Sequence, residues 1–436
     1  MTGYGGGQVN RRFMVVMVLC IATTGYAGEL WNLEDCLSLA STHSPEVERA
    51  EADISSAKGS LYSSWSGLLP GISGYADATR YSSEQISFYQ DEARISRNRY
   101  SWGLRLNQTI FNGGSSWARL SAGKASVRAA REQYHAVWGG VALQVAEGYY
   151  GVLRAAALVR VAGEAEELAK RQLERAEERY RMGAASRQEV LKGKVTLYQD
   201  KLARMRRENE LEAAKSSLLR LMGQEPGTEF ELVEPEDSRT EVPSLVECVE
   251  MGERHPSVRA YEAQLSRAKR NVTMARAGWF PSLTGSASYG WSDIEIPEDA
   301  DQYKNRDSWS LGLTVGLNIF DGLETAGNVQ QAKASERSAA VTLREQRLSH
   351  RHAVEDSHRE LKEALAQQEV AEVSMELAEE EYRLAEEQYG MGSLSFLELS
   401  DSKLALEEAK VTLIDSRYSV FIARASLNEA TGRLGR

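Results

Sequence analysis

The chain contains few residues that would interrupt a helix and no apolar run long enough to cross a membrane as one. Only 8 of its 436 residues are proline, while alanine and charged residues are abundant, and this composition predicts long helices. No window approaches the length of a transmembrane helix, which needs about 18 or more consecutive apolar residues. A membrane role would therefore have to use strands.

Other absences argue against whole classes of function. The net charge is -11 and no basic stripe is evident in the sequence, so we expect no nucleic acid partner. No phosphate-binding glycine loop, zinc-protease motif or nucleophile elbow occurs, so we expect neither enzymatic activity nor a cofactor. Cys36 and Cys248 each precede a histidine, His43 and His255, at the same spacing. Because repetition within the chain explains this coincidence, we expect no metal site and no disulfide there.

The first residues are typical of a secretory signal. Two arginines precede the apolar run 13–21, and small residues follow near Ala27, which predicts a signal peptide over 1–27. The run is about half as long as a retained membrane anchor would need. Cys20 does not favour lipidation, because the residues before it are not small.

After this segment the sequence consists of two similar halves. A stretch from about Leu33 to Gly223 recurs, element by element, from about Leu245 to Gly432. The period is too long for a solenoid, so each copy is expected to be half of one object. We therefore predict two structural repeats, 28–223 and 244–436, joined by an acidic, proline-containing linker at 224–243.

Two strands are expected in each repeat, because a period of two replaces the helical period. The predicted strands are 70–82, 99–111, 281–292 and 308–320, with polar loops within each pair. Each has about the length that crosses a bilayer when tilted. Four strands cannot close a barrel, which needs about eight, so a dimer, trimer or tetramer would have to share one. A soluble two-faced sheet is the alternative. Aromatic side chains cluster near the loop end, as in a membrane-interface girdle: Tyr100, Trp102, Tyr289, Trp291 and Trp309.

The remaining segments have helical patterns. The two longest, 113–182 and 322–391, have about 70 residues each and would form rods near 100 Å long. Each rod ends at a glycine, and a second helix returns after a serine N-cap, which predicts a helical hairpin. Apolar residues recur every seven positions, as in coiled coils, and either a closed tube or a multi-helix bundle would use them. The predicted helices are 45–67, 113–182 and 186–222 in the first repeat, and 256–278, 322–391 and 395–431 in the second.

The order of these elements resembles the TolC family of outer-membrane efflux proteins. The most specific segments are the paired hairpin turns, YRMGAAS at 180–186 and YGMGSLS at 389–395, and the strand exits FNGG at 111–114 and FDG at 320–322. The resemblance covers nearly all of the chain after the signal peptide. It rests on the order and duplication of these motifs, because none of them is specific alone.

The resemblance implies a mainly α fold with a β-barrel part. Three chains would pool their strands into a 12-stranded outer-membrane barrel and their helices into an α-barrel across the periplasm. Such a homotrimer is the exit duct of a tripartite efflux or type I secretion system, with a periplasmic adaptor, an inner-membrane pump and outer-membrane lipid as its partners. The alternative from another class is a soluble periplasmic coiled-coil adaptor or scaffold.

The resemblance also implies roles for the hairpin turns. Glu398 and Asp401 fall at positions that ring the pore gate, and Glu189 and Tyr389 match positions whose contacts hold it shut. Some members have at the Leu394 position an arginine that links the tips, and this chain lacks it. The alternative for Glu398 and Asp401 is that they are only solvated turn residues. Six residues at the tips would dock the adaptor: Met182, Gly183, Ser186, Met391, Gly392 and Ser395.

Overall fold

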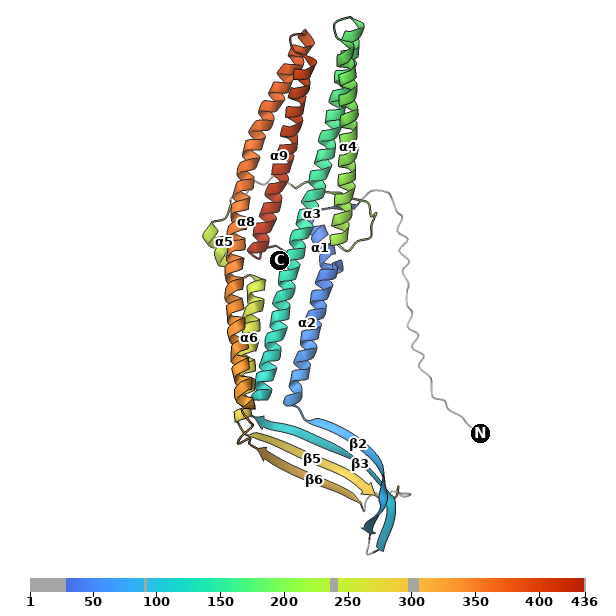
Figure 1. The fold of residues 1–436 in the computed structure, drawn as a ribbon, viewed down its shortest axis with the longest axis vertical. Coiled ribbons are helices and arrows are strands. Elements are labelled where there is room, and N and C mark those ends of the chain that lie inside the picture. Colours follow the sequence, from blue (N-terminus) through green and yellow to red (C-terminus); the bar gives the residue numbers. More distant parts are fainter. Residues whose placement is uncertain (1–28, 90–91, 236–241, 297–305, 435–436) are drawn as a thin grey trace, which may run out of the picture.

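The computed structural model describes residues 29–89, 92–235, 242–296 and 306–434. The predicted signal peptide and Cys20 lie outside the described residues. The chain is mostly helical and elongated, with a four-stranded sheet at one end and two helical hairpin turns at the other (Figure 1). Both long helices, α3 and α8, run from the sheet to the turns.

The first half contains a short helix pair, a long strand hairpin and a long helix hairpin. Its helices begin at good capping residues, such as Asn32, whose side chain accepts a hydrogen bond from the Asp35 backbone N–H at 2.8 Å. The elements are β1 (Glu29–Trp31), α1 (Leu33–His43), α2 (Pro45–Ser64), the 3₁₀ turn η1 (Trp65–Gly67), β2 (Gly71–Tyr89), β3 (Glu92–Asn112), α3 (Ser115–Arg181) and α4 (Arg187–Leu221).

The second half has the same order of helices and strands after a connecting strand. Its elements are β4 (Phe230–Leu232), α5 (Leu245–Gly252), α6 (Pro256–Arg276), the 3₁₀ turn η2 (Ala277–Trp279), β5 (Ser282–Asp293), β6 (Asp307–Gly316), α8 (Glu324–Met391) and α9 (Phe396–Ala430).

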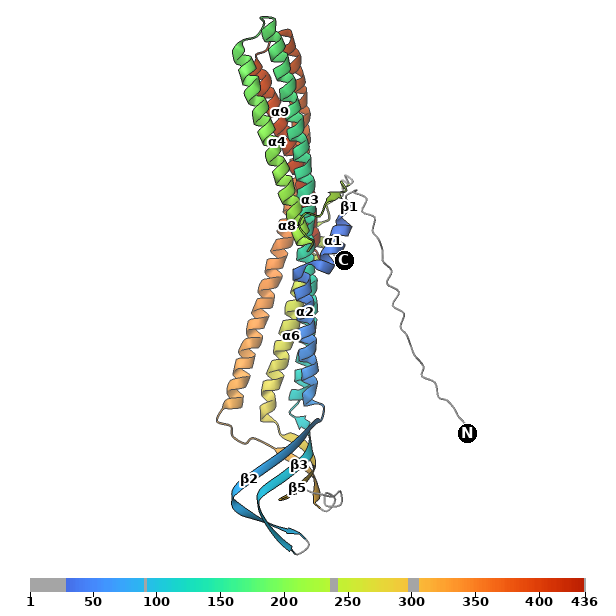
Figure 2. The same ribbon diagram turned by 90° about the vertical axis from the view of Figure 1, so that its right-hand side faces the viewer.

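The four long strands form one antiparallel sheet in the order β2-β3-β5-β6. The two hairpins join through β3 and β5, where Trp102 lies opposite Trp291 and Leu104 opposite Tyr289. β2 and β6 are therefore edge strands with no partner on their outer sides among the described residues. Figures 1 and 2 show the sheet curving away from the helix axes.

The strand boundaries differ from the sequence predictions at both edges. The strands of the first hairpin continue into the segment predicted to be a loop, because pairing resumes beyond a bulge between Arg80 and Gln85. Main-chain pairing in that exposed extension does not need alternating apolar residues, so the sequence pattern missed it. The predicted strand 308–320 ends at Gly316, because its partner β5 begins at Ser282, which lies opposite Gly316.

The helices have nearly the predicted spans, with one additional short helix at the start of each repeat. The predicted helix 45–67 ends as the 3₁₀ turn η1, and α1 and α5 were not predicted from the sequence. Within the predicted linker 224–243, β4 pairs in parallel with β1, and the Trp31 and Phe230 rings stack at 4.9 Å. β4 is therefore held in place by contact with Glu29–Trp31.

Each long helix is flanked by two shorter ones in succession. α3 packs against α2 near the sheet and against α4 near the tips, while α8 packs against α6 and then α9 (Figure 2). The apolar residues of α9 that recur every seven positions face its partner helix. Near the tips, Leu399 and Leu406 of this heptad seam are buried against α8. The largest apolar core lies midway along the molecule, where Leu218 and Met222 are fully buried among α1, α3 and α4.

Gly223 is expected to be a stability determinant of this midpoint. Its φ is +67°, and a Cβ there would lie 2.2 Å from the His43 carbonyl oxygen. We expect Gly223→Ala to destabilise the chain by about 3 kcal/mol or more, because both strain and a backbone clash must be relieved. Gly227→Ala is the control, since its φ is +89° but a Cβ would meet open space, so about 1 kcal/mol is expected. Thermal unfolding of the detergent-solubilised variants measures both; equal losses would contradict the clash.

Candidate functional site

The two tips are tight turns that glycine and serine shape. Gly183 and Gly392 follow α3 and α8 with φ of +77° and +78°, a left-handed conformation that ends a helix at little cost for glycine. Ser186 and Ser395 then cap α4 and α9 by accepting the backbone N–H of the residue three positions later. The turns therefore hold the adjoining side chains in fixed directions.

Glu398 is engaged by its own helix start. The Ser395 backbone N–H donates to the Glu398 carboxylate at 2.9 Å, and the Glu398 N–H donates to the Ser395 hydroxyl at 3.3 Å, completing a capping box. The Ser395 N–H, with a smaller contribution from the hydroxyl, lowers the pKa of Glu398. Asp401 lies one turn further along α9 and is exposed. Both acids are thus on the surface at the tip.

Tyr389 ties the two tips together. Its side chain is only 2% exposed and packs beside Phe396, with ring centroids 6.2 Å apart. The Arg179 guanidinium of α3 lies 4.6 Å from the Tyr389 ring centre and donates to the Tyr389 carbonyl oxygen at 2.9 Å. Burial raises the pKa of Tyr389; Arg179 opposes this, and Glu189 adds to it. No hydrogen bond or ion pair joins Glu189 to Tyr389 among the described residues, so the closing role that the resemblance implies for them stays a prediction.

A second contact joins the same helices one turn away. Arg175 of α3 and Glu386 of α8 form an ion pair at 2.7 Å. Neither Arg175 nor Arg179 was predicted from the sequence, although they lie four residues apart on one helix face. Their partners lie 211 and 210 residues later, which no local pattern reveals. We call Arg175, Arg179, Glu386 and Tyr389 the tip clasp.

The six predicted docking residues are at the surface of the turns. Met182 and Met391 have exposed fractions of 74% and 77%, which is unusual for methionine and typical of adaptable contact surfaces. The remaining four are also exposed: Gly183, Ser186, Gly392 and Ser395.

At the other end, the sheet has two different faces. The register puts Leu104 and Tyr289 on one face, and Arg105 and Ser288 on the other. Of the five predicted girdle residues, Trp309, Tyr289 and Trp102 are 77%, 45% and 37% exposed. Tyr100 is half-buried, whereas Trp291 is buried at 4%. The five predicted girdle residues thus differ in exposure within one chain.

A second group of exposed aromatics, absent from the sequence predictions, lies where helices meet strands. They are scattered through polar segments and follow no sequence period, so the sequence pattern could not identify them. What they share is their distance from the sheet, and only the three-dimensional structure shows that. The group comprises Tyr62, Trp65, Trp117, Trp279, Phe280 and Phe320.

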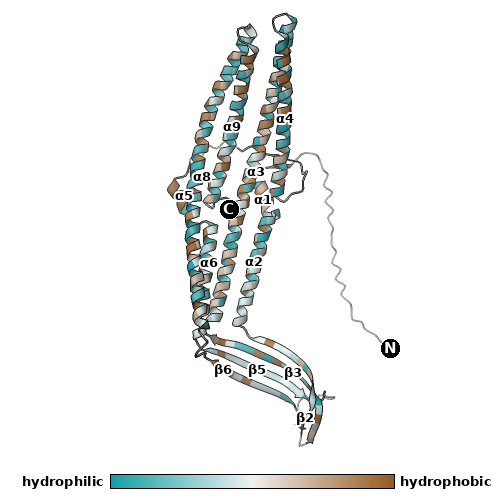
Figure 3. Cartoon of the chain, viewed as in Figure 1, coloured by the Kyte–Doolittle hydropathy of each residue, from teal (hydrophilic) through white to brown (hydrophobic). Residues whose placement is uncertain are grey.

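No helix in the described part of the chain is long and apolar enough to span a membrane. Figure 3 shows polar and apolar residues mixed along every long helix. Within the same residues, no three histidine, cysteine or acidic side chains group as metal ligands. Cys36 and Cys248 are buried free thiols, and burial raises the pKa of Cys36 to about 12.

His255 has a structural role instead. Its ring stacks on His350 with centroids 4.2 Å apart, and its Nδ1 accepts the Ser257 backbone N–H at 3.2 Å, capping α6. His350 lies 2.9 Å from the Ala430 carbonyl oxygen through Nε2. Burial and the neighbouring His255 lower the pKa of His350. This pair joins α6, α8 and the end of α9.

We expect the stacked pair to make stability depend on pH. Because the unfolded chain protonates His350 more readily, the free energy of unfolding is full above about pH 6.5 and falls as the pH drops below it. The melting temperature should fall between about pH 7.5 and 5.5, and this fall should be smaller in His350→Gln. His352→Gln is the control on the same helix, since that side chain is 64% exposed. Equal pH slopes in all three proteins would refute this.

Comparison with known proteins decides the family. A family model described as outer membrane efflux protein matches residues 36–224 and 249–433. The chain belongs to this family. The resemblance to TolC proteins is thereby confirmed, and the chain is an outer-membrane protein that extends into the periplasm.

Several known proteins are similar over most of the chain. Protein CyaE of Bordetella pertussis is 26% identical over 350 residues, covering 78% of this chain and 71% of that protein. Outer membrane protein TolC of Vibrio cholerae is 24% identical over 317 residues, covering 72% and 70%. The crystal structure of outer membrane protein VceC from Vibrio cholerae matches with a TM-score of 0.80 at 20% identity, covering 92% of this chain and 96% of that one. The last likeness confirms the mostly helical channel fold.

Proposed function

We propose that three copies of this chain form one outer-membrane channel, the exit duct of a tripartite efflux or type I secretion system. The sheet supports this. Its two edges are open, and on β6 Trp309, Leu311, Leu313 and Val315 are 72–77% exposed. Edge-to-edge pairing of three sheets would close a 12-stranded barrel and place these side chains in lipid.

The single observation that carries the proposal is a pair of unpartnered seams on the helices. On α4, five apolar side chains with spacings of four and three residues are 49–70% exposed. On α8, five more follow heptad spacing and are 43–77% exposed. Such seams need a partner helix, and α4 and α8 each have a free side for a neighbouring copy. The residues are Leu191, Val195, Tyr198, Leu202 and Met205, with Val370, Val373, Leu377, Leu384 and Met391.

In this assembly, each chain supplies two similar halves, 28–223 and 244–436, to the wall of the tube. Substrates pass by gated diffusion, without enzymatic chemistry. Tyr389 and Glu189 hold the tips closed, and the exposed turns dock a periplasmic adaptor that links the duct to an inner-membrane pump. Adaptor binding separates the tips and widens the ring formed by Glu398 and Asp401.

Imaging single particles extracted from outer membranes in mild detergent tests the proposal. We expect a hollow cylinder with the mass of three chains that forms ion-conducting channels in planar bilayers. The rival, a soluble coiled-coil adaptor or scaffold, predicts a detergent-independent monomer or dimer without conductance. The exposed apolar strand face argues against that rival.

The two tip acids are expected to set ion selectivity. Six carboxylates around a narrow opening favour cations, so Glu398→Gln with Asp401→Asn should lower the cation-to-anion permeability ratio by about threefold or more. Glutamine preserves the capping box, so the fold should remain intact. Reversal potentials in a salt gradient give the ratio. Glu376→Gln with Glu379→Asn, on α8 away from the turn, is the charge-matched control. Unchanged selectivity in the tip variant would remove both acids from the gate.

A further inference from the structure

The helices next to the sheet are basic, although the chain as a whole is acidic. Segments 55–67, 113–131 and 264–280, which adjoin the sheet in α2, α3 and α6, contain nine lysines and arginines and no acidic residue. The corresponding start of α8, 322–337, has two of each sign. The sequence shows no basic stripe because the fold, not the chain order, brings these segments together. The nine are Lys58, Arg119, Lys124, Arg128, Arg131, Arg267, Lys269, Arg270 and Arg276.

On α3, most of these cations share one side of the helix. Lys124, Arg128 and Arg131 lie 7, 11 and 14 residues after Trp117, so at about 100° per residue all four are on one face. Trp117 is 68% exposed. An exposed tryptophan at the boundary between helices and membrane strands is typical of a lipid interface, so this face points outward.

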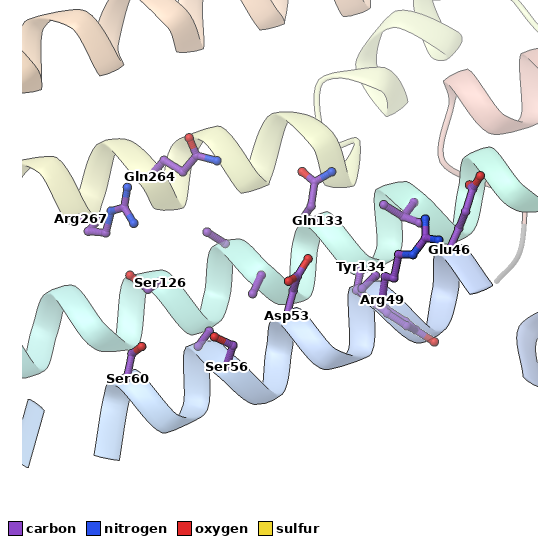
Figure 4. A pocket seen from close by; sticks show the side chains of 15 residues that line it. Glu46, Arg49, Asp53, Ser56, Ser60, Ser126, Gln133, Tyr134, Gln264 and Arg267 are labelled. Carbon is purple, nitrogen blue, oxygen red and sulfur yellow. The ribbon is translucent and has the colours of Figure 1, made fainter. Parts of the chain in front are cut away.

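The opposite side of the same helices forms a groove of about 700 Å³ between α2, α3 and α6 (Figure 4). Ser126 and Gln133 of α3 line it, and they lie half a turn from the Trp117 face. The groove is lined by both signs of charge, including Glu46, Asp53 and Arg267. Glu46 and Asp53 lie farther from the sheet than the three acid-free segments, so next to the sheet the two sides differ in their number of cations rather than in acids.

α2 and α6 follow the same division. On α2, Lys58 and Tyr62 are four residues apart on the side away from groove-lining Asp53. On α6, Lys269 and Arg276 are seven residues apart and share a face, half a turn from groove-lining Arg267. We call the five outward cations nearest the sheet the basic collar: Lys58, Lys124, Arg128, Lys269 and Arg276.

The collar is available for an outside partner. All five side chains are exposed, and none forms an ion pair within the residues that the structure describes. α3 and α6 have helices of the same chain on both sides, α2 and α8, so a neighbouring copy joined at the edges would leave their outward faces uncovered. The collar also adjoins the second aromatic group. Lys124 lies about 10 Å along α3 from Trp117, within reach of an interfacial headgroup layer.

We propose that the basic collar binds anionic phospholipid headgroups of the membrane leaflet that faces the periplasm. Aromatic side chains would lie at the level of the headgroups, and the cations just beyond them would pair with lipid phosphates. Each cation near an anionic surface contributes additively, and salt weakens the attraction. The inference rests on the proposed barrel, because only membrane strands put the collar at this depth.

The test compares lipid binding by two matched triple variants of the full chain in mild detergent. Lys58→Gln, Lys124→Gln and Arg276→Gln remove one outward cation from each helix. Arg49→Gln, Arg119→Gln and Arg267→Gln remove one cation from each of the same helices, on or near the groove side. Binding of fluorescent phosphatidylglycerol and phosphatidylcholine is titrated at low and high salt.

We expect the natural chain to prefer phosphatidylglycerol by about tenfold at low salt, with the preference lost at high salt. The collar variant should lose that preference and the groove-side variant should keep it. Equal behaviour of the two variants, or no preference in the natural chain, overturns the proposal. Mass and bilayer conductance are recorded for each protein. A conducting trimer without lipid preference refutes the collar alone, whereas a non-conducting monomer refutes the proposed channel and the collar with it.

Discussion

Replacing Tyr198 with lysine in the α4 seam, or Leu377 with glutamate in the α8 seam, is expected to abolish the trimer. Tyr198 is 70% exposed and Leu377 66% exposed in a single chain, yet each lies in the middle of a heptad seam. An unpaired charge buried in such an interface costs several kcal/mol, and a closed ring contains three copies of that cost. We expect the trimeric fraction to fall from dominant to under about one-tenth, with channel conductance lost in parallel. Native mass spectrometry measures the fraction.

Val246→Lys is the matched control for this experiment. Val246 is an equally exposed apolar residue, at 68%, but it lies on α5 outside both seams. Helical content should be unchanged in all three variants, because each replaced side chain is mostly exposed within its own chain. Trimers that persist with either seam variant would show that the copies meet elsewhere, and would remove the main support for the proposed assembly.

Loss of the tip clasp is expected to leave the duct leaky. Arg179→Ala removes both the contact with the Tyr389 ring and a charged hydrogen bond, and Arg175→Ala removes the ion pair with Glu386. The ring contact and the charged hydrogen bond of Arg179 are each worth about 1 to 2 kcal/mol, and the half-exposed ion pair of Arg175 under about 1 kcal/mol. With three copies in the ring, the double variant should raise the open population by more than about tenfold. Single-channel recordings measure the open fraction and conductance.

Arg383→Ala provides the control for the clasp. Arg383 also lies on α8 near the tip, but its ion pairs are with Glu380 and Glu387 of the same helix. Arg383→Ala should therefore leave gating unchanged, although it removes a positive charge just as Arg179→Ala does. A closed, quiet channel in the clasp double variant would show that other contacts hold the tips, and equal leakage in Arg383→Ala would show a general loss of charge rather than a clasp.

Most of the fold could be predicted from patterns that extend over long stretches of the sequence. The uninterrupted helical stretches and their glycine and serine turns put α3, α4, α8 and α9 within a few residues of the observed bounds, because caps are local signals. The errors arose where a non-local partner decides. β6 stops where β5 has no residue left to pair with it, and the first hairpin extends where only its own strands pair.

The tip residues divide in the same way. The start of α9 could be placed because a serine N-cap such as Ser395 is a local signal, and the resemblance then put Glu398 at the tip. The Arg179 partner could not, because a contact between residue 179 and residue 389 depends on how two hairpins lie side by side. The second aromatic group was missed for a related reason. Its members share a level in the molecule rather than a sequence period.

The difference between continuous and broken helices has a mechanical consequence. α3 and α8 are single rods of 67 and 68 residues, whereas their companions are split between α2 and α4, and between α6 and α9. At mid-length the apolar core around Leu218 and Met222 joins the ends of the shorter helices to α3. In the proposed channel, a force applied at the tips therefore reaches the sheet through two unbroken rods of each chain, and the packed midpoint ties the shorter helices to them.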